Sequence, residues 1–69
     1  MTHRGVVLSY FENGGYGFVK DPITKKQWFY HITRSPDLVE ITHIGMDVTF
    51  EVTISAVTFR EEAVNLRNV

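Results

Sequence analysis

Val48-Thr49-Phe50-Glu51-Val52-Thr53-Ile54 alternates without interruption, with apolar residues at every even position and polar residues at every odd position. Successive side chains of a β-strand point to opposite faces of a sheet, so this pattern predicts a strand with one face in a core and the other in water. The stretch is also rich in β-branched residues, which pack well on a pleated surface. It therefore indicates β-structure at this point of the chain.

Strand-type patterns cover most of the remaining sequence, and helix-type patterns are almost absent. Further strands are expected over residues 5–11, 16–20, 27–31 and 62–67, where β-branched and aromatic residues gather. Turn residues separate them. Asn13-Gly14-Gly15 predicts a hairpin turn, Asp21-Pro22 opens a polar loop, and Ser35-Pro36-Asp37 opens a longer connection that ends at Gly45. Residues 55–58 link the last two strands.

Five short strands in one flat sheet would expose an apolar face. Closure into a small barrel hides that face and removes the open strand edges. The sequence therefore predicts an all-β, five-stranded barrel that forms a single domain over residues 1–69. A two-sheet sandwich is the main competing architecture.

Composition excludes several classes of protein. The chain has 69 residues, no cysteine and three histidines, which argues against disulfides, a thiolate metal site and a structural zinc. No apolar run approaches the roughly 20 residues of a membrane helix. No apolar signal region follows Arg4 near the N-terminus. We expect a cytoplasmic protein with no cofactor and no membrane association. The formal net charge of −1 provides no overall basic field.

The second and third expected strands carry most of the aromatic residues. If these strands are neighbours, alternation gathers Tyr16, Phe18, Phe29 and His31 on one face and leaves Trp28 and Tyr30, with Gly17 and Val19, on the other. We expect the second set to face the barrel interior, because a bulky ring there needs a neighbour without a side chain, which Gly17 provides. The opposite assignment buries an imidazole and leaves Gly17 without a role.

Two interpretations of the outward rings stay open. Aromatic residues in strands commonly serve the core and cross-strand pairing. Four rings in one exposed patch can instead form a platform on which unpaired nucleobases stack, because every base has a π-face. The cations that could assist are Lys20, Lys25, Lys26 and Arg60.

These residues resemble the cold-shock domain family. Gly5-Val6-Val7 is similar to the family's opening Gly-x-Val, and Gly15-Tyr16-Gly17-Phe18-Val19 matches its first ribonucleoprotein motif at every position. Trp28-Phe29-Tyr30-His31 is similar to its Val-Phe-Val/Phe-His motif. Residues 45–52 resemble Gly-x-x-Val-x-Phe-Glu-Val, and residues 63–66 resemble the closing Ala-x-Asn-Val.

The resemblance implies an antiparallel oligonucleotide-binding (OB) fold that binds single-stranded RNA or DNA, as RNA chaperones do. It places Tyr16, Phe18, Phe29 and His31 at base-stacking positions. Lys20 follows the first motif, and Tyr10 lies near an aromatic position late in the first strand. With Arg60 of the closing loop, the candidate nucleic-acid-binding residues are Tyr10, Tyr16, Phe18, Lys20, Phe29, His31 and Arg60.

The chain departs from the family pattern at several positions. Ser9 stands where the family has an exposed Trp, Leu8 where it has a basic residue, and Gly14 where it has a Lys. The Phe of the connection before the fourth strand is absent, with Val39 or Ile41 as partial substitutes. The alternative function is therefore a protein-interaction or self-association module, such as a homodimer through the aromatic face. Catalysis is not expected, because no serine lies in a nucleophile-elbow sequence.

Overall fold

The computed structural model describes residues 2–35 and 44–69 of the chain. These residues contain five strands and one turn of 3₁₀-helix: β1 (His3–Phe11), β2 (Tyr16–Lys20), β3 (Gln27–His31), η1 (Ile32–Arg34), β4 (Asp47–Ile54) and β5 (Glu61–Asn68). The expected connection from Ser35 to Gly45 lies largely outside the described residues, since 36–43 are not among them.

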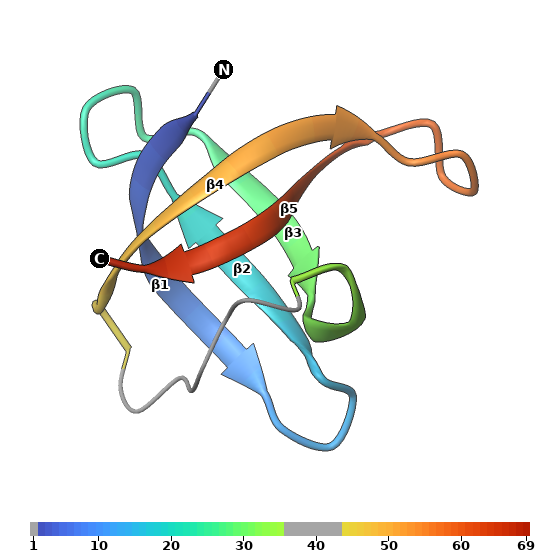
Figure 1. The fold of residues 1–69 in the computed structure, drawn as a ribbon, viewed down its shortest axis with the longest axis horizontal. Helices are drawn as coiled ribbons and strands as arrows, with labels where there is room; N and C mark the ends of the chain where they lie inside the picture. The colour runs from blue at the N-terminus through green and yellow to red at the C-terminus, as the bar shows by residue number, and fades with distance from the viewer. Residues whose placement is uncertain (1, 36–43) are drawn as a thin grey trace.

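The strands close into a barrel in the order β1-β2-β3-β5-β4, with β4 returning to β1 (Figure 1). This confirms the predicted five-stranded all-β barrel over the two-sheet sandwich. Four of the strand pairs are antiparallel, as expected, but β3 and β5 run parallel, through Phe29–Glu62 and Tyr30–Ala63. The sheet is therefore mixed rather than purely antiparallel. The parallel pair is what joins the β1-β2-β3 meander to the β4-β5 hairpin.

The observed strands extend slightly beyond the expected ones. β1 begins at His3, two residues before Gly5, because His3 and Arg4 pair with Phe50 and Thr49 of β4. β1 also contains an irregularity between Val7 and Ser9, where its pairing with β2 shifts by one residue. Such a bulge reverses the faces on which the following residues lie.

The barrel interior is filled by apolar side chains from every strand. Its buried members are Val7, Val19, Trp28, Tyr30, Val48, Phe50, Ala63 and Leu66. Val48 and Phe50 of the alternating stretch are fully inside, as predicted, whereas Ile54 at the end of β4 is 61% exposed. Ile54 escapes burial because β4 and β5 extend there into a loop that projects away from the barrel (Figure 1).

Local hydrogen bonds explain where the strands end. The β1–β2 turn closes with the N–H groups of Gly14 and Gly15 donating to the carbonyl of Phe11, and Gly15 adopts a φ of 67° that favours glycine. Asp21 ends β2 by accepting hydrogen bonds from the N–H groups of Ile23 and Thr24, and these bonds lower the pKa of its carboxyl group. No helix in the described part of the chain is long and apolar enough to span a membrane.

Candidate nucleic-acid interface

The two faces of β2 and β3 are separated as the alternation predicted. The pairing register sets Tyr16 opposite His31 and Phe18 opposite Phe29 on the outer face. On the inner face, Gly17 lies opposite Tyr30 and Val19 opposite Trp28, and all four of these residues are buried.

The sequence predicted that Gly17 makes room for a large ring inside the barrel. The structure shows that glycine is also required here by the backbone of β1. A Cβ atom at this position would collide with the backbone carbonyl oxygen of Ser9 on β1, and it would lie 2.9 Å from the hydroxyl oxygen of Tyr30. That hydroxyl donates a hydrogen bond to the same Ser9 carbonyl, at 3.3 Å. Burial, and after it the neighbouring Tyr10, raises the pKa of Tyr30 to about 12. Gly17 thus lets β1 approach β2 closely over the Tyr30 ring.

The outer rings form one continuous row. Ring centroids are 6.0 Å apart for Phe18 and Phe29, 5.7 Å for Phe29 and Tyr16, and 5.1 Å for Tyr16 and Phe11. These spacings lie within the range of interacting aromatic pairs. The exposed fractions are 37% for Phe18, 36% for Phe29 and 49% for Phe11. Each of these rings therefore keeps part of its surface in water while packing against its neighbours.

His31 of β3 lies opposite Tyr16 of β2 on the same outer face and is half-buried. Its Nδ1 atom accepts a hydrogen bond from the N–H of Thr33 at 3.2 Å, and the Thr33 hydroxyl lies 2.9 Å from the same atom. Because Nδ1 accepts the backbone hydrogen bond, this network assigns the proton of the neutral ring to Nε2. Thr33 of η1 thus holds the imidazole in place.

Tyr10 does not join the row. It lies opposite Gly17, on the inner side of the sheet, and packs against the core cluster while remaining partly exposed. The ring from β1 that does reach the outer face is Phe11, opposite Tyr16. Uninterrupted alternation from the buried Val7 would place Phe11 inside, but the bulge after Val7 turns it outward. The sequence therefore did not indicate Phe11 as a candidate, because strand alternation carries no signal for a bulge.

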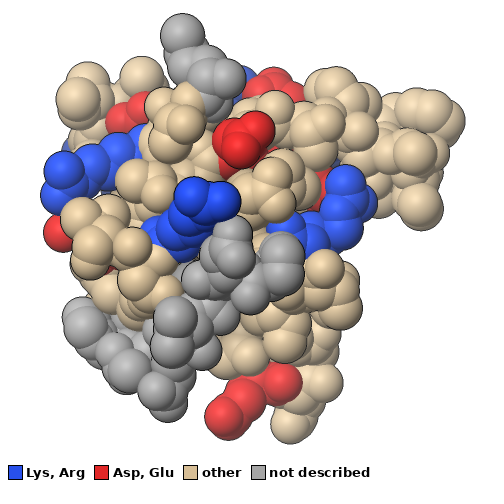
Figure 2. Space-filling model, viewed as in Figure 1, with Lys and Arg blue, Asp and Glu red and all other residues tan. Residues whose placement is uncertain are grey.

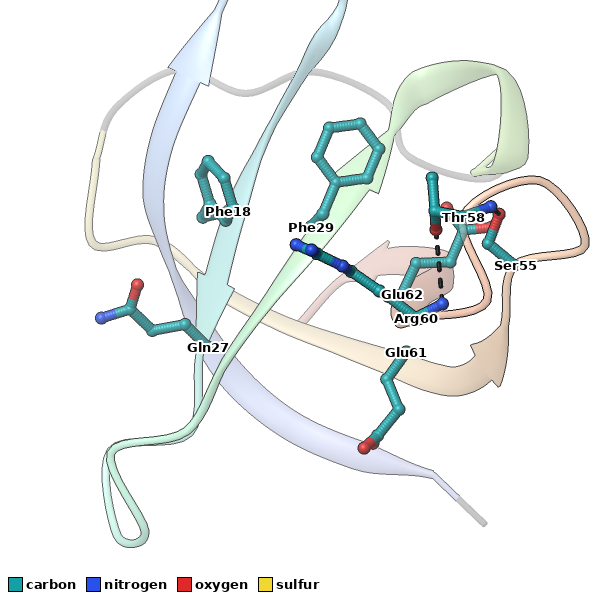
Figure 3. A pocket seen from close by; sticks show the side chains of 8 residues that line it. All are labelled: Phe18, Gln27, Phe29, Ser55, Thr58, Arg60, Glu61 and Glu62. Carbon is teal, nitrogen blue, oxygen red and sulfur yellow. Dashed lines mark hydrogen bonds between the residues drawn. The ribbon is translucent and has the colours of Figure 1, made fainter.

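A groove of about 490 Å³ lies beside the row. Its lining residues come from β2, β3, the β4–β5 loop and the start of β5: Phe18, Gln27, Phe29, Ser55, Thr58, Arg60, Glu61 and Glu62. Figure 3 shows Arg60 extending from the loop toward Phe29, while Phe18 and Phe29 stand side by side on their strands. Of the candidate cations, Arg60 therefore borders the rings directly.

The candidate cations differ in whether they form ion pairs. Lys20 ends β2 on the same face as Phe18, and within residues 2–35 and 44–69 neither Lys20 nor Arg60 forms an ion pair. Lys26, by contrast, already has partners: its Nζ lies 3.0 Å from Glu61 Oε2 and 5.4 Å from the centre of the Trp28 ring. The hydrogen bond from Lys26, followed by the one from Trp28 Nε1, lowers the pKa of Glu61. Lys26 is thus part of a local ion pair.

The groove also contains negative charge. Glu62 is buried and lines the groove, and its Oε1 lies 3.1 Å from Arg34 Nη1 of η1 in an ion pair without hydrogen-bond alignment. Glu61 lines the same groove, so among the described residues Arg60 is its one basic lining residue beside two acidic ones. On the opposite side of the barrel, the face over β4 and β5 carries basic and acidic side chains interspersed with uncharged ones (Figure 2). The rings, with Lys20 and Arg60 beside them, are therefore the chief groups that could bind a ligand here, and the described residues place no strong positive field around the groove.

These features define a class: a closed five-stranded β-barrel, compatible with an OB-fold, that carries a row of exposed aromatic rings on β2 and β3. No known family model matches the chain, and a search of curated proteins finds no match either. Val39 and Ile41 lie outside the described residues.

Proposed function

We propose that this protein binds single-stranded nucleic acid by stacking unpaired bases on the outer face of β2 and β3. The observation that carries the proposal is the continuous row in which Tyr16, Phe29 and Phe18 contact one another while remaining accessible. Hydrophobic rings of this size are normally buried, and an exposed cluster of them marks an interaction surface. The rings differ in tilt, with 30° between Tyr16 and Phe29 and 76° between Phe29 and Phe18, so each ring would stack a separate base of a flexible single strand.

The expected affinity is weak to moderate. Each stacked base contributes about 1–3 kcal/mol, so three or four rings supply roughly 3–12 kcal/mol in total. Association costs on the order of 4–15 kcal/mol of lost freedom, which offsets most of that gain. Lys20 and Arg60 add phosphate contacts at the edges of the row. With so few cations, we expect binding to depend only weakly on salt.

The sequence resemblance to cold-shock domains supports the same proposal. The positions at which that family stacks bases correspond to Tyr16, Phe18, Phe29 and His31, which share the outer face here. Ser9, which replaces the family's exposed Trp, lies opposite Phe18, so the row lacks a ring on that side. The proposed protein is thus a divergent, RNA-chaperone-like binder of the OB type. Because stacking does not read the 2′-hydroxyl, we propose RNA and DNA as partners alike.

A titration with a short, pyrimidine-rich single strand tests the proposal. Trp28 is buried in the barrel, so its emission is a poor reporter. Fluorescence anisotropy of a labelled oligonucleotide and amide chemical shifts of the protein are better suited. We expect saturable binding that shifts Phe18, Phe29 and His31. We also expect Phe18→Ala to weaken binding by about 1–3 kcal/mol in a folded barrel.

Ile23→Ala is the matched control, because Ile23 is an exposed apolar residue, at 89%, on the loop after β2 and away from the row. Its affinity should equal that of the native chain. The contrary result is an unperturbed spectrum at high oligonucleotide concentration together with dimerisation that depends on protein concentration. That outcome would favour the self-association module, for which Leu8 of β1, 37% exposed, extends the apolar surface.

A further inference from the structure

We infer that the hairpin end of β1 and β2 holds a further base-binding subsite, with Phe11 as its stacking ring. This inference rests on the proposed function and extends the row beyond the positions at which the resemblance places stacking residues. Phe11 lies 5.1 Å from Tyr16, centroid to centroid, the closest ring pair of the row. It is also the most exposed ring in the row, at 49%.

The surface next to Phe11 is hollowed and bordered by aromatic rings. A shallow hollow lies there, lined by Tyr10, Phe11, Glu12, Asn13, Gly14 and Tyr16. Neither Lys nor Arg lines it, whereas the carboxylate of Glu12 repels a phosphate. The Asn13 amide offers both a donor and an acceptor to the edge of a base. The hollow therefore fits an uncharged nucleobase, with the sugar–phosphate chain lying outside it.

Gly14 keeps the hollow and the row continuous. A Cβ atom at this position would overlap Cε1 and Cδ1 of the Tyr16 ring. The Tyr16 ring therefore lies over the backbone of the turn, where it contacts Phe11 on one side and Phe29 on the other. Glycine in place of a lysine here is consistent with a subsite that binds by stacking rather than by charge.

Together, Phe11 and Gly14 offset the ring that is missing at Ser9. The bulge after Val7 moves Phe11 to the outer face, so β1 supplies its aromatic group beside Tyr16 instead of beside Phe18. The row then runs from the groove at Phe18 to the hairpin end at Phe11. A bound strand would extend along the row over one more base than Tyr16, Phe29 and Phe18 can stack by themselves.

A series of labelled oligothymidylates, each one nucleotide longer than the last, tests this subsite by fluorescence anisotropy. For Phe11→Ala we expect affinity for the longer strands to fall about 5- to 150-fold, the loss of one stacked base. The gain in affinity with length should also end one nucleotide earlier than in the native chain. The shortest strands that bind should be held equally by both proteins.

Two further variants separate stacking from packing. Phe11→Leu keeps an apolar side chain without a flat π-face and should lose affinity as Phe11→Ala does, whereas Phe11→Trp should retain it. If Phe11→Ala and Phe11→Leu bind every length as the native chain does, while Phe29→Ala weakens binding, the hairpin subsite is overturned and the proposed function stands. If the native chain binds no oligonucleotide, the proposed function fails and the subsite fails with it.

Discussion

The ten residues of β2 and β3 form two faces, and the two faces differ in their role. Inside, Gly17, Val19, Trp28 and Tyr30 are buried in the barrel. Outside, the rings at alternate positions remain accessible and touch one another in a row. An aromatic residue in these strands is therefore structural or available for binding according to the parity of its position, because side chains of a strand alternate between faces.

This contrast teaches that neighbouring aromatic residues need not share a role. Phe29 and Tyr30 are adjacent in the chain, but the first is 36% exposed and the second is fully buried. Substitutions at the two positions should consequently affect different measurements.

Tyr30→Ala should unfold the barrel, whereas Phe29→Ala should not. Removing a buried ring costs about 3–5 kcal/mol, which equals the whole net stability of roughly 3–5 kcal/mol expected for so small a core. Phe29 is already 36% exposed. Its substitution removes two ring pairs, with Phe18 and Tyr16, at about 0.5–1.5 kcal/mol each, so the loss should be smaller than for Tyr30. Urea denaturation followed by circular dichroism measures both. Equal destabilisation by the two substitutions would show that the outer rings belong to the core.

Gly17→Ala tests how closely β1 approaches β2. The added methyl group has no space, because the Ser9 backbone and the Tyr30 hydroxyl occupy it. Backbone cannot yield as a flexible side chain does, so we expect a loss of about 1–3 kcal/mol in the free energy of unfolding. Gln27→Ala, at an exposed position of β3, is the control and should change stability little. A Gly17→Ala barrel as stable as the native one would contradict the close approach of β1 and β2.

Alkaline pH should destabilise the inner face through Tyr30. Burial raises its pKa from 10.0 to about 12, so the unfolded chain loses this proton at a lower pH than the folded chain. Its contribution to stability is complete below pH 10 and declines as pH rises toward about 12. Tyr30→Phe, which cannot titrate, should show a smaller decline over this interval in urea titrations at several pH values. Identical declines in the two proteins would place the cause elsewhere.

The fold followed from local patterns to a large extent. The alternation of residues 48–54 and the turn residues at Asn13-Gly14-Gly15 and Asp21-Pro22 were sufficient to predict five strands, and closure followed from the need to hide an apolar face. The parallel pairing of β3 with β5 was not foreseen. It joins segments separated by a long connection, and no local pattern encodes which strands meet across such a distance.

The candidate site, too, could be predicted from the sequence only in part. Alternation paired Tyr16 with Phe18 and Phe29 with His31, because strand geometry is a property of the local backbone, and the expectation that the two strands are neighbours brought the four residues onto one face. Only the tertiary structure decided that Phe11 joins the row and Tyr10 does not, since a bulge in β1 depends on its pairing with β2. The assembled barrel also brought Arg60 beside Phe29 and bound Lys26 to Glu61. These contacts link residues that are distant in the chain, so they arise only once the barrel has closed.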